Sequence, residues 1–163
     1  MSVREIRVFG DPVLRERAAP VDPADPATAA LVQDLLDTVQ LPGRAGVAAC
    51  QIGVAKAAFS FLVDGELGYV LNPRIDEVRG EVELVDEGCL SVPELGFPTP
   101  RHPYCRVVGQ NLDGDEIVLE GEGLMAQMLQ HEMAHLDGKL YLQALEKDMR
   151  AIAMAEVRKA PWY

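Results

Sequence analysis

The most constraining feature of the sequence is an apolar run over residues 123–136 that carries two histidines and a glutamate. The run has no proline and no internal glycine, and its apolar residues lie nearly all round a helix, which predicts a buried helix. His131 and His135 are four residues apart, so on a helix both imidazoles point the same way and can grip one metal ion. Glu132 directly follows the first histidine, so its carboxylate can lie near the open coordination position of that metal and transfer protons. Burial of these three side chains without partners would be costly, which favours a metal site over a chance match.

A catalytic metal of this kind usually has three protein ligands and an open position for water, so a third ligand is needed. One class of metalloprotease supplies a further histidine where this chain has Tyr141. No histidine follows His135, although downstream carboxylates leave a zinc peptidase of the His-Glu-x-x-His type open as an alternative. The upstream candidate is Cys89, at an expected strand end before a proline turn. A non-enzymatic structural metal module is disfavoured, because such a site usually needs four protein ligands and no fourth offers itself.

The segments around this helix alternate between helical and extended patterns. Asp25 followed by proline begins an amphipathic helix expected over residues 27–40, and a last helix is expected over about 146–159. Short β-prone runs separated by glycine, proline and asparagine fill the middle of the chain. The expected strands cover residues 57–63, 68–72, 78–85, 104–111 and 116–120.

The spacers between these strands are too short for crossover helices, so the strands should be largely antiparallel. Asp113-Gly114 is a good hairpin turn between the last two. We therefore expect an α+β fold, with mostly antiparallel β-sheets packed around a central metal-binding helix, an N-terminal amphipathic helix and a C-terminal helix. The length predicts a single domain over residues 1–163.

Charge and cysteine content narrow the class of function. The formal net charge of −11 makes nucleic acid a poor partner, because an acidic surface repels phosphate backbones. The sequence has no apolar run long enough for a membrane span and no signal peptide at its start, so we expect a cytoplasmic protein with no membrane partner. The odd number of cysteines argues against a disulfide framework, and Cys50 and Cys105 are expected to be small buried side chains.

Three short motifs follow one another along the chain. The first is Gly-Val-Ala-Ala-Cys-Gln at residues 46–51, the second is Glu-Gly-Cys-Leu-Ser at 87–91, and the third is Gln-His-Glu-Met-Ala-His at 130–135. In content, order and separation they resemble the motifs of the peptide deformylase family. The similarity runs from about residue 5 to residue 145.

The resemblance implies a metal centre and a reaction. Cys89, His131 and His135 would hold one divalent metal per chain, typically Fe(II) in the family, with Zn(II), Ni(II) or Co(II) able to take its place. The donor set itself does not decide between these ions. The reaction would remove the N-terminal formyl group from formyl-methionyl nascent polypeptides and release formate.

The resemblance also implies roles for residues around the metal. Metal-bound hydroxide would attack the formyl carbon, with Glu132 as general base and then acid. The side-chain amide of Gln51 and the backbone N–H of Leu90 would face the developing oxyanion. The pocket for the methionine side chain would be lined by His131 and by four further residues, Ala45, Gly46, Gln127 and Met128.

The chain departs from the family pattern at positions that concern substrate recognition more than chemistry. Arg44 stands where a glycine is common, Gly96 where an arginine is frequent, and Ala134 where an aspartate is frequent. Gln127 is polar for an apolar pocket wall and would fit equally against backbone. A deformylase-like paralogue with altered substrate preference therefore remains an alternative.

The C-terminal segment bears on partners. In some members of the family the C-terminal helix touches the ribosome through basic residues. Here residues 145–163 are nearly neutral, so we expect a helix packed on the domain through Ile152, Met154 and Val157, with at most a weak, transient ribosome contact.

Overall fold

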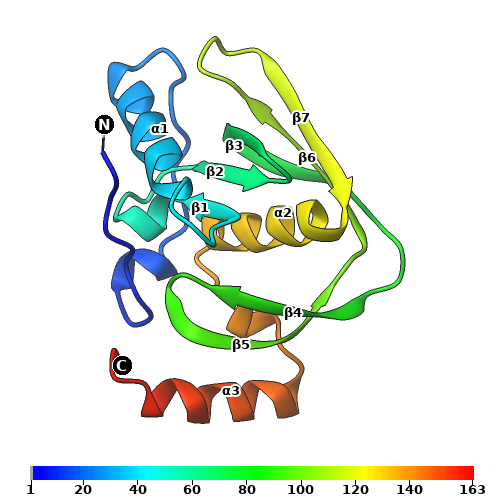
Figure 1. Ribbon diagram of the computed structural model, residues 1–163. Helices are drawn as coiled ribbons and strands as arrows, with labels where there is room; N and C mark the ends of the chain where they lie inside the picture. Colours follow the sequence, from blue (N-terminus) through cyan, green and yellow to red (C-terminus); the bar gives the residue numbers. More distant parts are fainter. Residues whose placement is uncertain (1) are drawn as a thin grey trace.

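The helix that carries the two histidines lies at the centre of the fold. A computed structural model describes residues 2–163. In it α2 (Gly123–Leu136) lies between a five-stranded sheet and a two-stranded hairpin (Figure 1). The predicted range 123–136 is confirmed, and the α+β class with antiparallel sheets is confirmed as well.

The five-stranded sheet has the order β1-β2-β3-β6-β7, and every neighbouring pair is antiparallel. Its strands are β1 (Gly46–Ala48), β2 (Ala58–Val63), β3 (Glu66–Arg79), β6 (Tyr104–Gln110) and β7 (Glu116–Glu122). The separate hairpin consists of β4 (Glu83–Cys89) and β5 (Val92–Arg101). Short 3-10 turns η1 (Pro12–Arg15), η2 (Ala49–Ile52) and η3 (Tyr141–Ala144) complete the connections.

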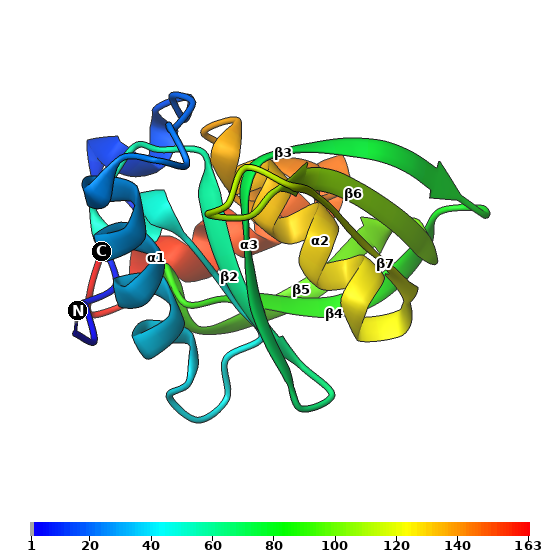
Figure 2. The same ribbon diagram turned by 90° about the horizontal axis from the view of Figure 1, so that it is seen from above.

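Strand β2 is buried on both faces because a helix covers each side of the sheet (Figure 2). Phe59 and Phe61 pack in one cluster with Leu129 of α2. Ala58 lies in a second cluster with residues of α1 (Pro26–Val39), and Ser60 donates a hydrogen bond of 2.8 Å to the Leu35 carbonyl. The run of apolar residues in β2 therefore follows from its two-sided burial.

Helix α1 begins as its sequence predicts. The Asp25 side chain accepts a hydrogen bond of 2.9 Å from the Ala27 N–H, and Pro26 occupies the first helical position. Its buried residues include Leu31, Leu35 and Val39, the apolar stripe read from the sequence. This stripe fixes the helix on β1, β2 and β3, directly before the segment that enters the site.

Helix α3 (Lys147–Lys159) packs on β5 and η3 at the lower side of the hairpin (Figure 1). Val157 and Ala153 are fully buried, and Met154 is partly buried. Ile152 is 55% exposed, so the expectation that it packs on the domain is wrong, because it turns away from the buried face. The Trp162 indole N–H donates to the Pro93 carbonyl at 3.2 Å and fastens the following segment to β5.

Two parts of the strand prediction are wrong. The run 78–85 is not one strand: β3 continues to Arg79, Gly80 turns with φ of 86°, and β4 begins at Glu83. Strand β5 was not expected, because its prolines lack the N–H that a ladder needs. It is tolerated because β5 belongs to a two-stranded sheet, where only one side of the strand must pair.

Within residues 2–163, none of the helices combines the length and the apolar character that a membrane crossing requires.

Candidate metal centre

Three side chains that can bind a metal converge where the tip of the hairpin meets α2. The ligand atoms of Cys89, His131 and His135 all lie within 4.8 Å of one another. Cys89 Sγ and His135 Nε2 are 3.5 Å apart. In a tetrahedral site with ligand bonds of 2.0–2.3 Å, two ligand atoms are separated by about 3.5 Å, so this pair fits one shared ion. A thiolate and two imidazoles form a donor set that suits a divalent transition metal.

The helix and the hairpin each position part of this cluster. On α2 the two histidine rings have centroids 4.9 Å apart at 70°, as expected for positions i and i+4. Cys89 is the last residue of β4, and a two-residue turn leads from it to Val92 in β5. The pairing shifts between Gly88 and Cys89, so the residues 93–95 bulge from the partner strand. Such a bulge re-aims side chains, and here Cys89 faces α2.

His131 is oriented by a buried chain of charges that the sequence did not reveal. Its Nδ1 lies 2.7 Å from Oε2 of Glu87, which leaves Nε2 for a metal. Arg101 donates to both Glu87 oxygens, from Nε at 2.8 Å and from Nη2 at 2.5 Å. Burial alone would raise the pKa of Glu87, but the hydrogen bonds from Arg101 and His131 outweigh it and lower that pKa to about 2. Glu87 is therefore a buried carboxylate anion that holds the imidazole ring.

The two histidines have opposite electrostatic surroundings. Burial opposes the charged form of His131, but its interactions with Cys89 and Glu87 outweigh burial and hold its pKa well above the usual value. For His135 burial dominates, and the nearby positive charges of His131 and Arg101 add to it, so the pKa is held well below the usual value. His135 is therefore a neutral imidazole, the form that binds metals.

Glu132 is buried beside the cluster and has the properties of a proton carrier. It is 3% exposed, and its Oε1 has no hydrogen-bond partner within residues 2–163. Burial raises the pKa of Glu132 to about 7, in the range where a carboxyl group can take up and release a proton at neutral pH. A Cβ at Gly46 would lie 2.8 Å from Glu132 Oε2, so the missing side chain on β1 gives this carboxyl group its space.

Gln51 is held with its amide nitrogen toward the cluster. Its Oε1 accepts a hydrogen bond of 3.0 Å from the Ala48 N–H, which fixes the orientation of the amide. Its Nε2 then lies 3.1 Å from Ser91 Oγ and 3.7 Å from Cys89 Sγ. A side chain that is 1% exposed and anchored at its oxygen is a preorganised donor.

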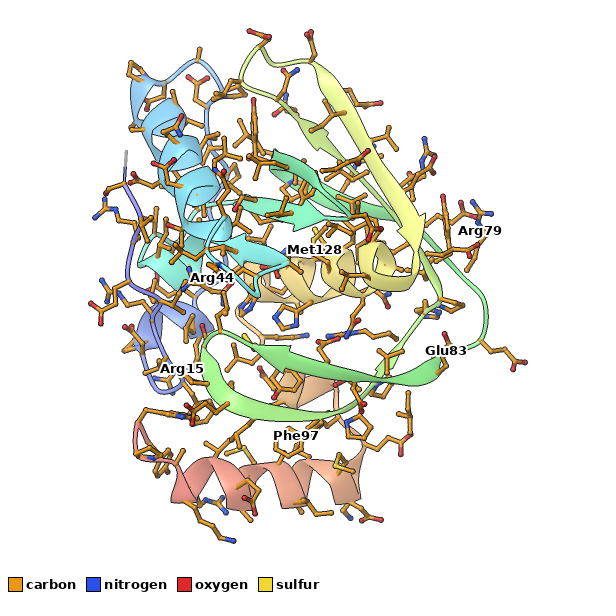
Figure 3. All side chains as sticks on the ribbon, in the orientation of Figure 1. Arg15, Arg44, Arg79, Glu83, Phe97 and Met128 are labelled. Atoms are coloured by element: carbon orange, nitrogen blue, oxygen red, sulfur yellow. The ribbon has the colours of Figure 1, made fainter. Side chains whose placement is uncertain are left out.

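A cavity of about 430 Å³ opens above these residues. The residues expected at the site that line it are Ala45, Gly46, Gln51, Cys89, Leu90, Gln127, Met128, His131 and Glu132. His135 is 1% exposed and is not among the lining residues. Figure 3 shows Arg44 in the segment before β1 and Met128 on α2, both above the hairpin in that view. The first and third sequence motifs thus line the same cavity, although about 80 residues of intervening chain separate them.

The positions that depart from the family pattern have distinct surroundings. Gln127 donates from Nε2 to the Asp86 carbonyl at 2.8 Å, so its amide nitrogen is bonded to the backbone of β4. Arg44 lines the cavity, whereas Gly96 is absent from its lining. Leu124 was expected to be buried in α2, but it is 46% exposed and lines the cavity. An apolar residue at that place adds to a surface that an apolar ligand can cover.

Tyr141 stands where the metalloprotease pattern requires a histidine, and its ring packs against a candidate ligand. The rings of Tyr141 and His131 are stacked, with centroids 6.0 Å apart and an angle of 29°. The ligand group found in residues 2–163 consists of the thiol and the two imidazoles and includes no carboxylate downstream of His135. This geometry weighs against a peptidase with a downstream carboxylate ligand.

Comparison with known proteins gives consistent matches. The family model described as "Polypeptide deformylase" matches residues 3–151. The curated peptide deformylase of Acidothermus cellulolyticus is 43% identical over 162 residues, which cover 99% of this chain and 89% of that protein. The protein named "Peptide deformylase 1" of Corynebacterium efficiens is 41% identical over 167 residues and covers 100% and 99% of the two chains.

Solved structures agree with these sequence matches. The crystal structure of peptide deformylase from Thermus thermophilus has a TM-score of 0.88 at 38% identity, covering 96% of this chain and 94% of that one. The enzyme from Thermotoga maritima has a TM-score of 0.83 at 36% identity, with coverage of 90% and 99%.

Proposed function

The chain belongs to the polypeptide deformylase family of hydrolases, and from this premise we propose that it removes the formyl group from formyl-methionyl nascent polypeptides. The observation that carries the proposal is the convergence of the ligand atoms of Cys89, His131 and His135, two of which (Cys89 and His131) line a cavity together with Glu132. We propose that these three side chains hold one divalent metal, natively Fe(II). Zn(II), Ni(II) and Co(II) suit the same donors.

A divalent metal bound there would lower the pKa of a water molecule toward neutral pH and so supply a nucleophile. We assign to Glu132 the uptake of a proton from that water and its transfer to the leaving amine, a role that the pKa of about 7 of this carboxyl group supports. Glu87 and Arg101 are positioning residues that keep the His131 ring in one orientation. The ion pairs between Arg101, Glu87 and His131 would thus preorganise the site before a substrate binds.

The oxygen of the formyl group requires donors where negative charge develops. Gln51 Nε2 faces the cluster, and Leu90 lies in the turn directly after Cys89 and lines the same cavity. We assign the Gln51 amide and the Leu90 backbone N–H to this oxyanion site. Two such donors would stabilise the transition state more than the substrate.

The methionine side chain of the substrate would occupy the apolar part of the cavity. Ala45, Gly46, Gln127 and Met128 line it, and Leu124 extends the apolar wall toward solvent. Gln127 Nε2 is already bonded to β4, so the methylene groups of this side chain are the part we assign to contact with a methionine. This packing favours formyl-methionine over a formylated polar residue.

The proposal is tested by measuring formate release from a formyl-Met-Ala peptide with protein loaded with Fe(II) without oxygen. We expect turnover by the unaltered chain and a loss of at least about 100-fold in kcat for Glu132→Gln, the range typical of a general base. Cys89→Ala should abolish metal binding. Cys105→Ala is the matched control, because this thiol is buried in β6 away from the cavity and should keep both metal and activity.

Each alternative has its own signature in the same assay. A His-Glu-x-x-His peptidase would cleave internal bonds of an unformylated peptide, and Cys89→Ala would keep its metal. A paralogue with altered preference would deformylate formyl-methionine poorly and another formylated peptide well. Absence of formate release from every formylated peptide by Fe(II)-loaded protein would contradict the proposed function.

Location and partners follow from the proposed substrate. The three cysteines are free, as expected in a reducing compartment, which supports the proposed cytoplasmic site of action. For α3 we propose packing on the domain rather than ribosome binding. Its residues Ala153 and Val157 are fully buried against the rest of the domain.

A further inference from the structure

The segment between α1 and β1 places one strongly basic side chain in the wall of the cavity. Arg44 is partly buried there, and burial lowers the pKa of its guanidinium. Within residues 2–163 the structure gives it one hydrogen bond, from Nη1 to the Thr38 carbonyl at 2.9 Å, and no ion pair. A guanidinium has five N–H donors, so this single bond leaves most of its recognition capacity unused.

The other charges in the wall do not neutralise Arg44. Glu87 is already bonded to Arg101 and His131, and Glu132 lies under Gly46. Asp86 and Glu94 line the cavity from the hairpin, where Glu94 occupies the bulge with φ of 67°. A ligand in the cavity therefore meets one unpaired cation on the side of the α1–β1 segment and acidic groups on the hairpin side.

A partly desolvated arginine without an anion is a binding group for a carboxylate, because a guanidinium and a carboxylate form charge-assisted, bidentate hydrogen bonds. The chain as a whole carries a net charge of −11 and would repel an acidic peptide. A single cation in the cavity wall can outweigh that repulsion only at short range, when the peptide is bound in the site.

We propose that Arg44 is a specificity-determining residue that binds an acidic side chain of the peptide substrate, downstream of the formyl-methionine. This proposal rests on the deformylase function proposed above. The enzyme would then favour chains with aspartate or glutamate in the first residues after methionine over chains with the neutral amides. For a partly exposed ion pair the preference should be about 3- to 10-fold in kcat/KM, expressed mainly in KM.

The bond to Thr38 gives Arg44 a structural role as well, since it satisfies a carbonyl in the last turn of α1. Loss of that bond would disturb the loop and lower activity on every substrate to a similar extent. The test therefore needs a ratio between two substrates that differ only in charge, because a structural defect cancels in the ratio.

The experiment compares formyl-Met-Ala-Asp-amide with formyl-Met-Ala-Asn-amide. A second pair, formyl-Met-Asp-Ala-amide and formyl-Met-Asn-Ala-amide, has the variable residue directly after methionine. The amidated ends exclude a terminal carboxylate, and formyl-Met-Ala with a free end measures that source separately. We expect the unaltered enzyme to prefer the acidic member, Arg44→Gln to bring the ratio to about one, and Arg44→Lys to retain part of it. The preference should also decrease as KCl is raised from about 50 to 500 mM.

Arg158→Gln is the matched control, because it removes one exposed cation from α3 and should leave the ratio unchanged. An unaltered ratio in Arg44→Gln, or an equal loss on both peptides, would overturn the proposal and leave Arg44 as an anchor of the loop. A preference only for the free chain end would contradict the assignment to a side chain. Release of no formate from any peptide would overturn the deformylase function and this proposal together.

Discussion

At the scale of the residue, the site depends on contacts that choose between two orientations of a side chain. Gln51 is the clearest case, because the Ala48 N–H binds its oxygen and so turns its nitrogen toward Cys89. His131 is similar, since Nδ1 lies 2.7 Å from Glu87 Oε2, which leaves Nε2 for a metal. The partner of Gln51 is local in sequence, whereas the partner of His131 lies 44 residues away and is brought to it by the fold. The chemistry of the site is therefore set as much by these partners as by the residues themselves.

Gln51→Ala should separate the oxyanion donor from the metal site. We expect kcat to fall about 100- to 1,000-fold, the usual loss for one such donor, while metal content measured by mass spectrometry stays at one per chain. Gln33→Ala is a suitable control, because Gln33 lies on the exposed face of α1, where its side chain donates a hydrogen bond to Asp37. Loss of metal together with activity would show instead that Gln51 holds the Cys89 ligand in place.

At the scale of the element, periodicity predicted the helices well and the strands less well. Helices α1, α2 and α3 all fall within one residue of their expected ranges, because caps and apolar spacing are local signals. The sequence pattern does not predict the hairpin β4–β5. It places Gly80 in the middle of one strand, and the prolines of β5 are typical of a loop. The pairing of Glu87 with Arg101 depends on that hairpin. The group of Cys89, His131 and His135 could thus be predicted from the sequence, whereas the pairing of Glu87 with Arg101 beside it could not.

The two faces of α3 should respond differently to truncation. Val157→Ala removes two methyl groups from a fully buried position and should lower the free energy of unfolding by about 2 kcal/mol. Ile152→Ala removes more apolar surface, but this residue is 55% exposed, so the change should stay within about 0.5 kcal/mol. Urea unfolding measures both values. Equal losses would mean that α3 packs through the face first expected from the sequence.

At the scale of the whole molecule, a buried charged chain joins the hairpin to α2. Glu87 belongs to β4, Arg101 to β5 and His131 to α2, so the three elements are joined through one carboxylate. Because Glu87 is 5% exposed, its protonation would leave Arg101 and His131 without their anion inside the protein. The stability of the whole chain should therefore depend on the charge of this one group.

The pKa of Glu87, lowered to about 2 from 4.5, determines how the stability of the chain changes with pH. The folded form binds the proton less well than the unfolded form, so the stabilisation is complete above pH 4.5 and is lost as the pH falls from 4.5 toward 2. From this change in pKa, the stabilisation is about 3 kcal/mol. Urea unfolding at a series of pH values should show this loss in the metal-free chain.

Glu87→Gln should remove that part of the pH dependence, whereas Glu83→Gln, at an exposed position of the same strand, should keep it. Curves for Glu87→Gln that parallel those of the unaltered chain would show that other carboxyl groups cause the acid sensitivity.

The placement of Cys89 and His135 has a consequence for the chain as a polymer. These two residues lie 46 positions apart in sequence and 3.5 Å apart at their ligand atoms. A metal shared by them would act as a reversible cross-link that closes a long loop, and the entropy lost on closing such a loop changes only slowly with its length. Metal binding would therefore be coupled to folding, so that the midpoint of thermal unfolding rises with the concentration of free metal. The same bonds that prepare the chemistry would also shift the balance between the folded and unfolded chain.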